Sequence, residues 1–374
     1  LTETDKRLQV RETLASCPDI ERALGRLALE RGGPRDLAAI RDALIRAKAL
    51  KILLTVDEKA KCPSELVVVS QAFGSNDALI QLLEKSLAEE LPLITRDGGF
   101  VAPEYSPILD EYRLARDESR RLVRNLETRY REQTGVNVLK VKHNNILGYF
   151  VEVTPAHSDK MPATFIHRQT LASSIRYTTT ELGELEEKIA RAGELALTLE
   201  LEIFAELVVE VRQQNVVLTQ IAEGLAQVDV AAGLADLAVA RDYVRPNIDD
   251  GNGFHIVGGR HPVVEAVTAM KVDGPSFIGN DCELSDTQRI WLLTGPNMAG
   301  KSTFLRQNAL IVLLGQMGSF VPAASANFGI VDRLFSRVGA SDDLARGQST
   351  FMVEMSQTAN ILNNVTDRSL VILD

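Results

Sequence analysis

A turn bounded by glycines at residues 295–303 carries the residue types that bind nucleotide phosphates. It reads Gly-Pro-Asn-Met-Ala-Gly-Lys-Ser-Thr, follows the apolar run 290–293 and precedes an apolar segment with helical spacing. Gly295 and Gly300 let the backbone curl so that successive N–H groups point at phosphate oxygens, beside the positive end of the following helix. The pattern, in its strand–turn–helix context, predicts a P-loop.

The side chains of this turn have separate expected roles. Lys301 is expected to reach the β- and γ-phosphates of ATP as a catalytic residue, and Ser302 to place its hydroxyl on Mg²⁺. Leu370 to Leu373 form an apolar run followed by Asp374, the form of a Walker B strand whose acid holds the same Mg²⁺ and serves catalysis. The expected cofactors are therefore ATP and Mg²⁺. The expected ATP-binding residues of the turn are Gly295, Pro296, Asn297, Met298, Ala299, Gly300, Lys301, Ser302 and Thr303.

A second candidate surface lies in the strand-patterned stretch from Val136 to Thr180. Apolar and polar residues alternate on either side of the turn signal at 144–148, which predicts a hairpin. Five basic and two acidic residues give the stretch a net charge of +3, so the rest of the chain carries −13. Such a module suits contacts to a phosphate backbone, and an ordinary solvated hairpin face is the alternative. Its three histidines are not at metal-ligand spacing.

Helical segments are expected to position both sets of residues. Amphipathic helices fill residues 1–93, with a break at 31–34, and a charged helix covers 106–132. Helical spacing returns at Thr180 for over forty residues. This helix is expected to pair antiparallel with 106–132, which places the β module at their shared tip. From Gly251 the pattern is α/β, with strands near 254–257, 281–285, 290–293 and 328–338 and a helix over 307–317.

Composition narrows the class of protein. A chain of 374 residues with 45% hydrophobic and 25% charged residues is long enough for two or three globular domains. The net charge of −10 means that any DNA contact must come from a local patch. Cys17, Cys62 and Cys282 lack the spacing of a zinc site or a disulfide framework, which suits a reducing cytosol. We find no apolar run of membrane-spanning length and no signal peptide.

Three segments together resemble the MutS family of DNA mismatch-repair proteins: 294–303, 335–343 and 349–355. The segments 260–265, 144–153 and 168–171 agree, and the resemblance spans nearly the whole chain. It implies a multidomain fold with α-helical core and lever helices, an inserted small β clamp, and an α/β P-loop ATPase domain of the ABC type that is truncated. The implied domains are a helical core with the first lever helix (1–125), a DNA clamp (126–180), the returning lever helix and core (181–244), and the ATPase domain cut at Walker B (245–374).

The same resemblance assigns roles to particular residues. Phe277 would stack near the adenine, and Asn297 with the turn amides would hold the phosphates. Ser349 would be the signature serine that reaches the γ-phosphate of ATP in the other subunit, which makes a dimer necessary. The expected DNA contacts of the clamp are Lys140, Lys142, His143, Arg168 and Arg176. The implied partners are mismatched double-stranded DNA, a second copy in a homodimer or higher homo-oligomer, and a MutL-type repair protein, with no membrane. The implied location is the bacterial cytosol, at the nucleoid.

The chain departs from the family pattern in several places. Ala299 stands where the family usually has glycine. Nothing corresponds to the amino-terminal domain with its Phe-x-Glu wedge, to the connector domain, or to the family's catalytic Glu and trans-acting His beyond Walker B. Because the chain starts at Leu1 and stops at Asp374, we expect a fragment that keeps nucleotide and clamp contacts but lacks mismatch reading and efficient hydrolysis. The alternatives are a MutS-type paralogue acting in recombination, a chromosome-condensing or break-repair ATPase, and, last, a metabolic P-loop kinase.

Overall fold

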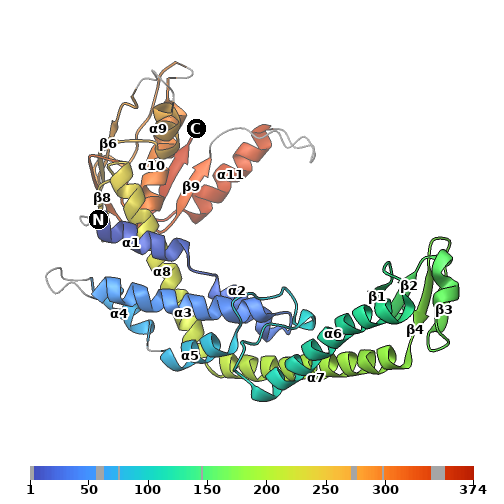
Figure 1. The fold of residues 1–374 in the computed structure, drawn as a ribbon. Coiled ribbons are helices and arrows are strands. Elements are labelled where there is room, and N and C mark those ends of the chain that lie inside the picture. The colour runs from blue at the N-terminus through green and yellow to red at the C-terminus, as the bar shows by residue number, and fades with distance from the viewer. Residues whose placement is uncertain are drawn as a thin grey trace. The chain divides into compact units, whose positions relative to one another are not determined.

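The structure, a computed structural model, describes residues 4–55, 63–74, 76–144, 146–270, 276–296, 299–337 and 350–374 (Figure 1). The chain divides into two compact units. One unit comprises Leu1–Glu12 with Ala226–Asp374, and the other comprises Thr13–Leu225. Helices α1 (Thr4–Ala15) and α8 (Asn215–Ala240) each contribute residues to both units.

Helices fill the first part of the unit Thr13–Leu225, as the sequence predicts. They are α2 (Ile20–Ala28), α3 (Pro34–Thr55), α4 (Ser64–Ala72) and α5 (Asp77–Ser86), followed by the 3₁₀ turn η1 (Thr95–Asp97). The Asp19 carboxylate accepts a hydrogen bond from the Arg22 amide and so caps α2. Helix α3 buries Leu37, Ile40 and Leu50 completely against its neighbours. Amphipathic spacing thus builds the base of this unit.

Two long helices leave this base side by side (Figure 1). Helix α6 (Pro107–Thr134) starts at a Ser106 cap and stops at Gly135, whose φ of 63° ends it in the left-handed conformation. Helix α7 (Thr180–Gln213) starts at a Thr179 cap. Contacts between residues 130 and 179 and between 113 and 200 show that the helices run antiparallel, as predicted.

The helix predicted to run for over forty residues after Thr180 is shorter. It ends at Gln213, and α8 starts anew at Asn215. The Gln214 amide donates to the carbonyls of Val211 and Arg212, which closes the last turn more tightly than an α-helix does. Three consecutive polar residues at 213–215 interrupt the apolar three-and-four spacing at this point.

A small antiparallel sheet, here called the tip sheet, joins the far ends of α6 and α7. Its strands are β1 (Lys140–Asn144), β2 (Gly148–Val153), β3 (Ile166–Thr170) and β4 (Ile175–Thr178), in the order β1-β2-β4-β3, with the 3₁₀ segment η2 (Pro155–Lys160) after β2. Val136 and Val138, expected in the first strand, precede it, because the Leu139 amide turns back to the Val136 carbonyl.

One hydrophobic core is shared by the tip sheet and the ends of both long helices. Its buried residues come from α6, the sheet with its adjoining segments, and α7: Val123, Leu126, Tyr130, Val136, Leu139, Val151, Val153, Phe165, Tyr177, Leu182, Leu185 and Ile189. The Tyr130 hydroxyl and the Thr179 hydroxyl also share a buried hydrogen bond of 2.6 Å. The sheet therefore folds together with the helix ends rather than on its own.

The described residues of the other unit form two sheets. Strands β5 (Asn247–Asp249), β6 (Phe254–Gly259), β7 (Asn280–Leu284) and β8 (Ser325–Gly329) form the order β5-β8-β6-β7, and β9 (Leu334–Arg337) pairs in parallel with β10 (Leu370–Leu373). Besides the parts of α1 and α8 that belong to this unit, its described helices are α9 (Pro262–Ala269), α10 (Lys301–Gln316) and α11 (Thr350–Asn364). Phe254, Phe328 and Ile311 lie in the core between the larger sheet and α10.

The prediction of a buried strand at 290–293 is wrong in this structure. Ile290 is 84% exposed and Leu292 is 88% exposed, while Trp291 stacks on Phe304 of α10 with ring centroids 6.2 Å apart. A strand persists only where its backbone groups find a neighbouring strand, and none of the described strands pairs with this run. The apolar composition of residues 290–293 was therefore not enough to make this run a strand.

Among the described helices, no single one is long and apolar enough to cross a membrane. The bent pair α4 and α5 meets the criterion together, by length and composition only.

Candidate nucleotide site and nucleic-acid interface

The glycine-bounded turn opens directly onto the amino terminus of α10. Gly300 is the N-cap of this helix at a φ of 92°, and Gly295 has a φ of 156°. A Cβ at either position would meet no atom of the described residues within 4 Å, so the backbone conformation rather than crowding favours glycine. No described side chain caps the helix, which leaves the amides of its first turn available to an anion.

The Lys301 ammonium lies over the same turn. Its Nζ donates to the Gly295 carbonyl at 2.7 Å and to the Pro296 carbonyl at 2.8 Å. A cation held by two neutral carbonyls retains its full charge for an incoming phosphate. The expected contacts Asn297 and Met298 lie outside the described residues, whereas Ala299, Ser302 and Thr303 flank the lysine in sequence.

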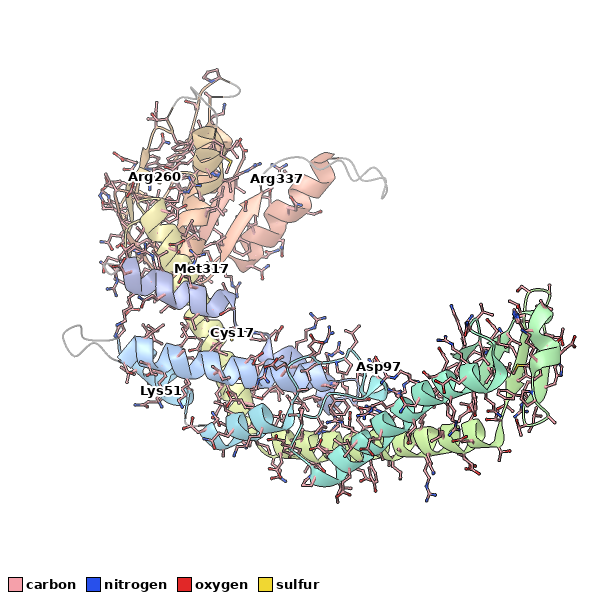
Figure 2. The ribbon with its side chains drawn as sticks, viewed as in Figure 1. Cys17, Lys51, Asp97, Arg260, Met317 and Arg337 are labelled. Carbon is pink, nitrogen blue, oxygen red and sulfur yellow. The ribbon has the colours of Figure 1, made fainter. Side chains whose placement is uncertain are left out.

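The two expected Mg²⁺ ligands come from different elements. Ser302 lies in the first turn of α10, and exposed Asp374 follows β10, a strand that packs against α10. The main chain of Asp374 is fixed by Arg337 (labelled in Figure 2), since its amide donates to the Arg337 carbonyl at 2.9 Å and its carbonyl accepts from the guanidinium at 3.1 Å. One hydroxyl and one carboxylate form a donor set that fits Mg²⁺ bound together with phosphates. Ser349 lies outside the described residues.

Phe277 is half-buried in the segment 276–279, just before β7. This segment runs close to the end of β6, since a Cβ at Gly279 would lie 3.0 Å from the backbone of Gly258 in that strand. Ile278 beside it is 81% exposed. The segment therefore presents apolar side chains at the edge of the larger sheet.

The five residues expected to contact DNA are distributed over the tip sheet. Lys140 and Lys142 on β1 and Arg176 on β4 point to the face opposite the hydrophobic core. His143 alternates to the core side, where its ring packs 4.8 Å from that of Tyr149. Arg168 is exposed at the bulge of β3. The structure thus brings three of the five together on one face.

The sequence analysis missed the role of an acid on that face. Glu152 of β2 accepts a hydrogen bond from Lys142 at 2.6 Å and one from the Arg176 guanidinium at 3.4 Å. The Lys142 hydrogen bond, with the two positive charges, lowers the pKa of the Glu152 carboxyl. Only the register, which sets Glu152 opposite Lys140 on one side and Arg176 on the other, reveals this arrangement.

The comparisons with known proteins bear on both regions. A family profile described as MutS domain V matches residues 291–374, and one described as MutS family domain IV matches residues 104–195. The chain is 54% identical to the "DNA mismatch repair protein MutS" of Nitrobacter hamburgensis and 56% identical to the protein of that name from Dinoroseobacter shibae, and both alignments cover 98% of this chain. The chain belongs to the MutS family.

The chain spans less than half of the length of the MutS proteins that it matches. This chain covers 41% of the Nitrobacter protein and 42% of the Dinoroseobacter protein. The MutS domain IV match takes in α6, the tip sheet and the first half of α7, and the MutS domain V match takes in the glycine-bounded turn, α10, β9 and β10. Several domains built of helices and small sheets are thus established for this MutS chain.

A buried polar group that the sequence did not single out lies in α10, one turn beyond the glycine-bounded turn. Gln307 of α10 is fully buried, and neither of its amide atoms has a partner in the described part of the chain. Its Nε2 would be 2.6 Å from a Cβ at Gly259. Two residues after that glycine, His261 accepts a hydrogen bond from the Val264 amide and so caps α9. Burial of the His261 side chain lowers the pKa of its imidazole.

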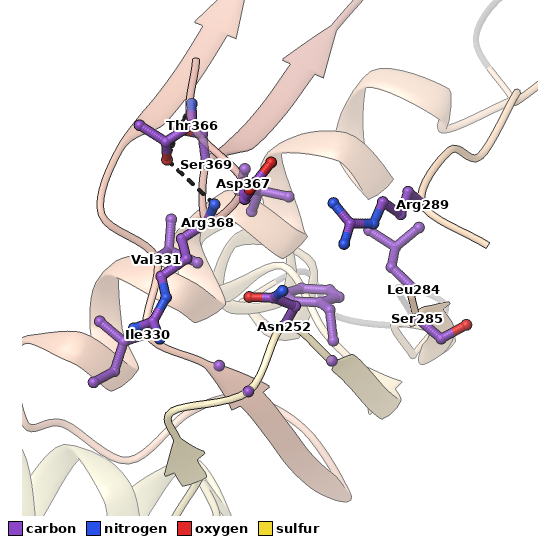
Figure 3. A pocket seen from close by; sticks show the side chains of 15 residues that line it. Asn252, Leu284, Ser285, Arg289, Ile330, Val331, Thr366, Asp367, Arg368 and Ser369 are labelled. Carbon is purple, nitrogen blue, oxygen red and sulfur yellow. Dashed lines mark hydrogen bonds between the residues drawn. The ribbon is translucent and has the colours of Figure 1, made fainter. Parts of the chain in front are cut away.

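A pocket of about 230 Å³ in the same unit is separate from the expected ATP contacts (Figure 3). Its lining includes Arg289, Arg368 and Leu370. Close to it, Asp332 accepts from the hydroxyls of Thr366 at 2.7 Å and Ser369 at 3.1 Å, and the Thr366 hydrogen bond lowers the pKa of that carboxyl. These bonds tie the segment before β10 to the one before β9. Among the described residues, no cluster of three or more His, Cys, Asp or Glu side chains could hold a metal ion.

Proposed function

We propose that this MutS chain carries the ATP-binding and DNA-clamping parts of a mismatch-repair recognition protein. The observation that carries the proposal is the uncapped, glycine-bounded start of α10 with the Lys301 ammonium over the turn. It occurs in a chain more than half identical to proteins named for DNA mismatch repair. The turn amides and Lys301 bind the ATP phosphates, Phe277 stacks near the adenine, and Ser302 and Asp374 hold Mg²⁺.

When bound, Mg²⁺ neutralises charge that develops on the transferred phosphoryl group. The chain's own residues orient the phosphates for hydrolysis, with Lys301 as the fixed cation. In a dimer, Ser349 of one copy would reach the γ-phosphate held by the other, so that ATP binding favours association. The proposed domain limits stay at 1–125, 126–180, 181–244 and 245–374.

The tip sheet is proposed as the clamp that contacts duplex DNA. Support comes from its three cations on one face, Lys140, Lys142 and Arg176, in a chain whose total charge is −10. Contacts of this kind bind the phosphate backbone without reading sequence, and they weaken as salt rises. ATP binding and hydrolysis would switch the state of the clamp, and a MutL-type repair protein would be a downstream partner.

The test is fluorescence anisotropy on homoduplex and single-mismatch duplex, with and without ATP, with salt as a variable. The full-length protein is compared with the chain 1–374 and with a Lys301→Ala variant. We expect ATP to change DNA binding in the wild-type protein but not in the variant, and mismatch preference to reside in the full-length protein alone. If ATP leaves DNA binding unchanged in every protein, the switching proposal is wrong. Equal binding of both duplexes by the full-length protein would refute mismatch recognition. Steady-state ATPase measurements on the same proteins test hydrolysis.

A further inference from the structure

One acid lies in the middle of the cationic face of the tip sheet. Lys142 Nζ and Glu152 Oε1 are 2.6 Å apart, and Arg176 Nε and Glu152 Oε2 are 3.4 Å apart. The two carboxylate oxygens are thus divided between cations from two different strands. Lys140, whose Cα is paired with that of Glu152, adds a third positive charge at the same level of the sheet.

This arrangement is ordered before any partner arrives. The Glu152 side chain is only 18% exposed and that of Arg176 only 20%. The Arg176 guanidinium also donates to the Gln169 side chain at 2.9 Å and lies 4.5 Å above the centre of the buried Phe150 ring. A guanidinium held on three sides keeps its direction, and its carboxylate partner stays ionised because its pKa is lowered.

The acid changes what the face offers to a phosphate. Without Glu152, Lys142 and Arg176 would present two full positive charges; with it, the three groups together carry one. A DNA phosphate that approaches either cation must compete with a carboxylate that already holds the same N–H groups. Among the described cations of the sheet, Lys140 and Arg168 are exposed and form no ion pair with Glu152.

We propose that Glu152 is a built-in counter-ion of the DNA-contacting face, which orders Lys142 and Arg176 and at the same time weakens their hold on phosphate. The inference rests on the proposed clamp function and deepens it: the clamp face is set for loose, exchangeable contact with the DNA backbone. Glu152 is a positioning residue that acts through the two cations, and it need not touch DNA.

The experiment uses the full chain and a short fluorescent homoduplex without nucleotide, titrated between about 50 and 200 mM salt. Glu152→Gln keeps the shape and a hydrogen-bond acceptor but removes the competing charge. If one more phosphate is neutralised, the slope of log K against log salt becomes more negative by about 0.9. For two proteins that bind DNA equally at about 1 M salt, this makes binding by the variant about eight-fold tighter at about 0.1 M salt. Asp159→Asn is the matched control, because it removes one negative charge from η2 in the same module but outside the cluster.

A double-mutant cycle separates the counter-ion role from a structural one. Lys142→Gln should weaken DNA binding much more in the Glu152→Gln background than in the wild-type protein, because only there is the lysine charge free. The proposal is overturned if Glu152→Gln binds DNA no better than Asp159→Asn, or if the effect of Lys142→Gln is the same in both backgrounds.

Two further variants distinguish failure of this inference from failure of the clamp proposal. Lys140→Ala and Arg168→Ala remove cations that Glu152 does not hold. If both leave DNA binding unchanged, the sheet does not contact DNA, and the clamp proposal and this inference fail together. If they weaken binding while Glu152→Gln does not strengthen it, the clamp proposal stands and the counter-ion role is excluded.

Discussion

The attachment of the tip sheet to α6 allows a quantitative prediction. One oxygen of the Glu127 carboxylate accepts from the Val141 amide at 2.8 Å, and the other accepts from Arg131. Arg131 in turn donates from Nε to the Leu139 carbonyl at 2.7 Å. Two side chains of α6 thus bond to alternate backbone groups of the β1 edge, as a neighbouring strand would.

Glu127→Ala removes the acceptor of a backbone N–H and the partner of an arginine. The orphaned amide costs ~1–3 kcal/mol. The ion pair adds little, because the two side chains are 26% and 36% exposed and such pairs contribute ~0–1 kcal/mol. We therefore expect opening of β1 to become easier by about 2 kcal/mol, which is about 30-fold faster amide exchange at Val141.

Hydrogen-exchange mass spectrometry on peptides that contain residues 139–144 measures this change. Glu132→Ala is the matched control, because Glu132 is exposed on the same helix and its removal should leave those peptides unaffected. Unchanged exchange at β1 in the Glu127→Ala protein would refute the idea that α6 side chains complete the strand edge. Faster exchange in the control as well would attribute the effect to the helix rather than to the hydrogen bonds.

Three other substitutions have defined expected outcomes. Glu200→Ala removes a carboxylate that is 3% exposed and lies 2.6 Å from the Arg113 guanidinium. We expect it to lower the free energy of unfolding by ~3–5 kcal/mol, because it leaves the arginine charge without its partner. Denaturant titration should show a smaller loss of this free energy for Glu200→Gln. Gln307→Met removes two buried polar atoms that have no partner among the described residues, so thermal melting should show a gain of ~1–2 kcal/mol; a lower melting temperature would mean that the amide is satisfied in solution. Gly148→Ala should destabilise by ~1–2 kcal/mol because φ is +68°. The new Cβ would meet only the carboxylate end of Glu186, which can rotate away, so melting should show the same loss in a Glu186→Ala background.

Local features were predictable from the sequence, and features that depend on partners were not. Helices α6 and α7 and the hairpin β1–β2 follow from periodicity and caps that lie within each segment. The turn 295–303 could be singled out because its residues are contiguous in sequence, and its role as a phosphate site stays a prediction. The run 290–293 was mistaken for a strand because an apolar stretch does not say what its backbone bonds to. Glu152 was missed because its place between two cations depends on cross-strand register.

The shared core at the far ends of α6 and α7 has a consequence for engineering. Its buried side chains run from Val123 to Ile189, so the limits at 126 and 180 pass through the middle of a packed cluster rather than through a linker. A graft or deletion made at those limits would split the cluster and expose apolar surface on both pieces. A transplantable version needs the flanking helical turns, which makes the smallest exchangeable module a sheet with two helix stubs.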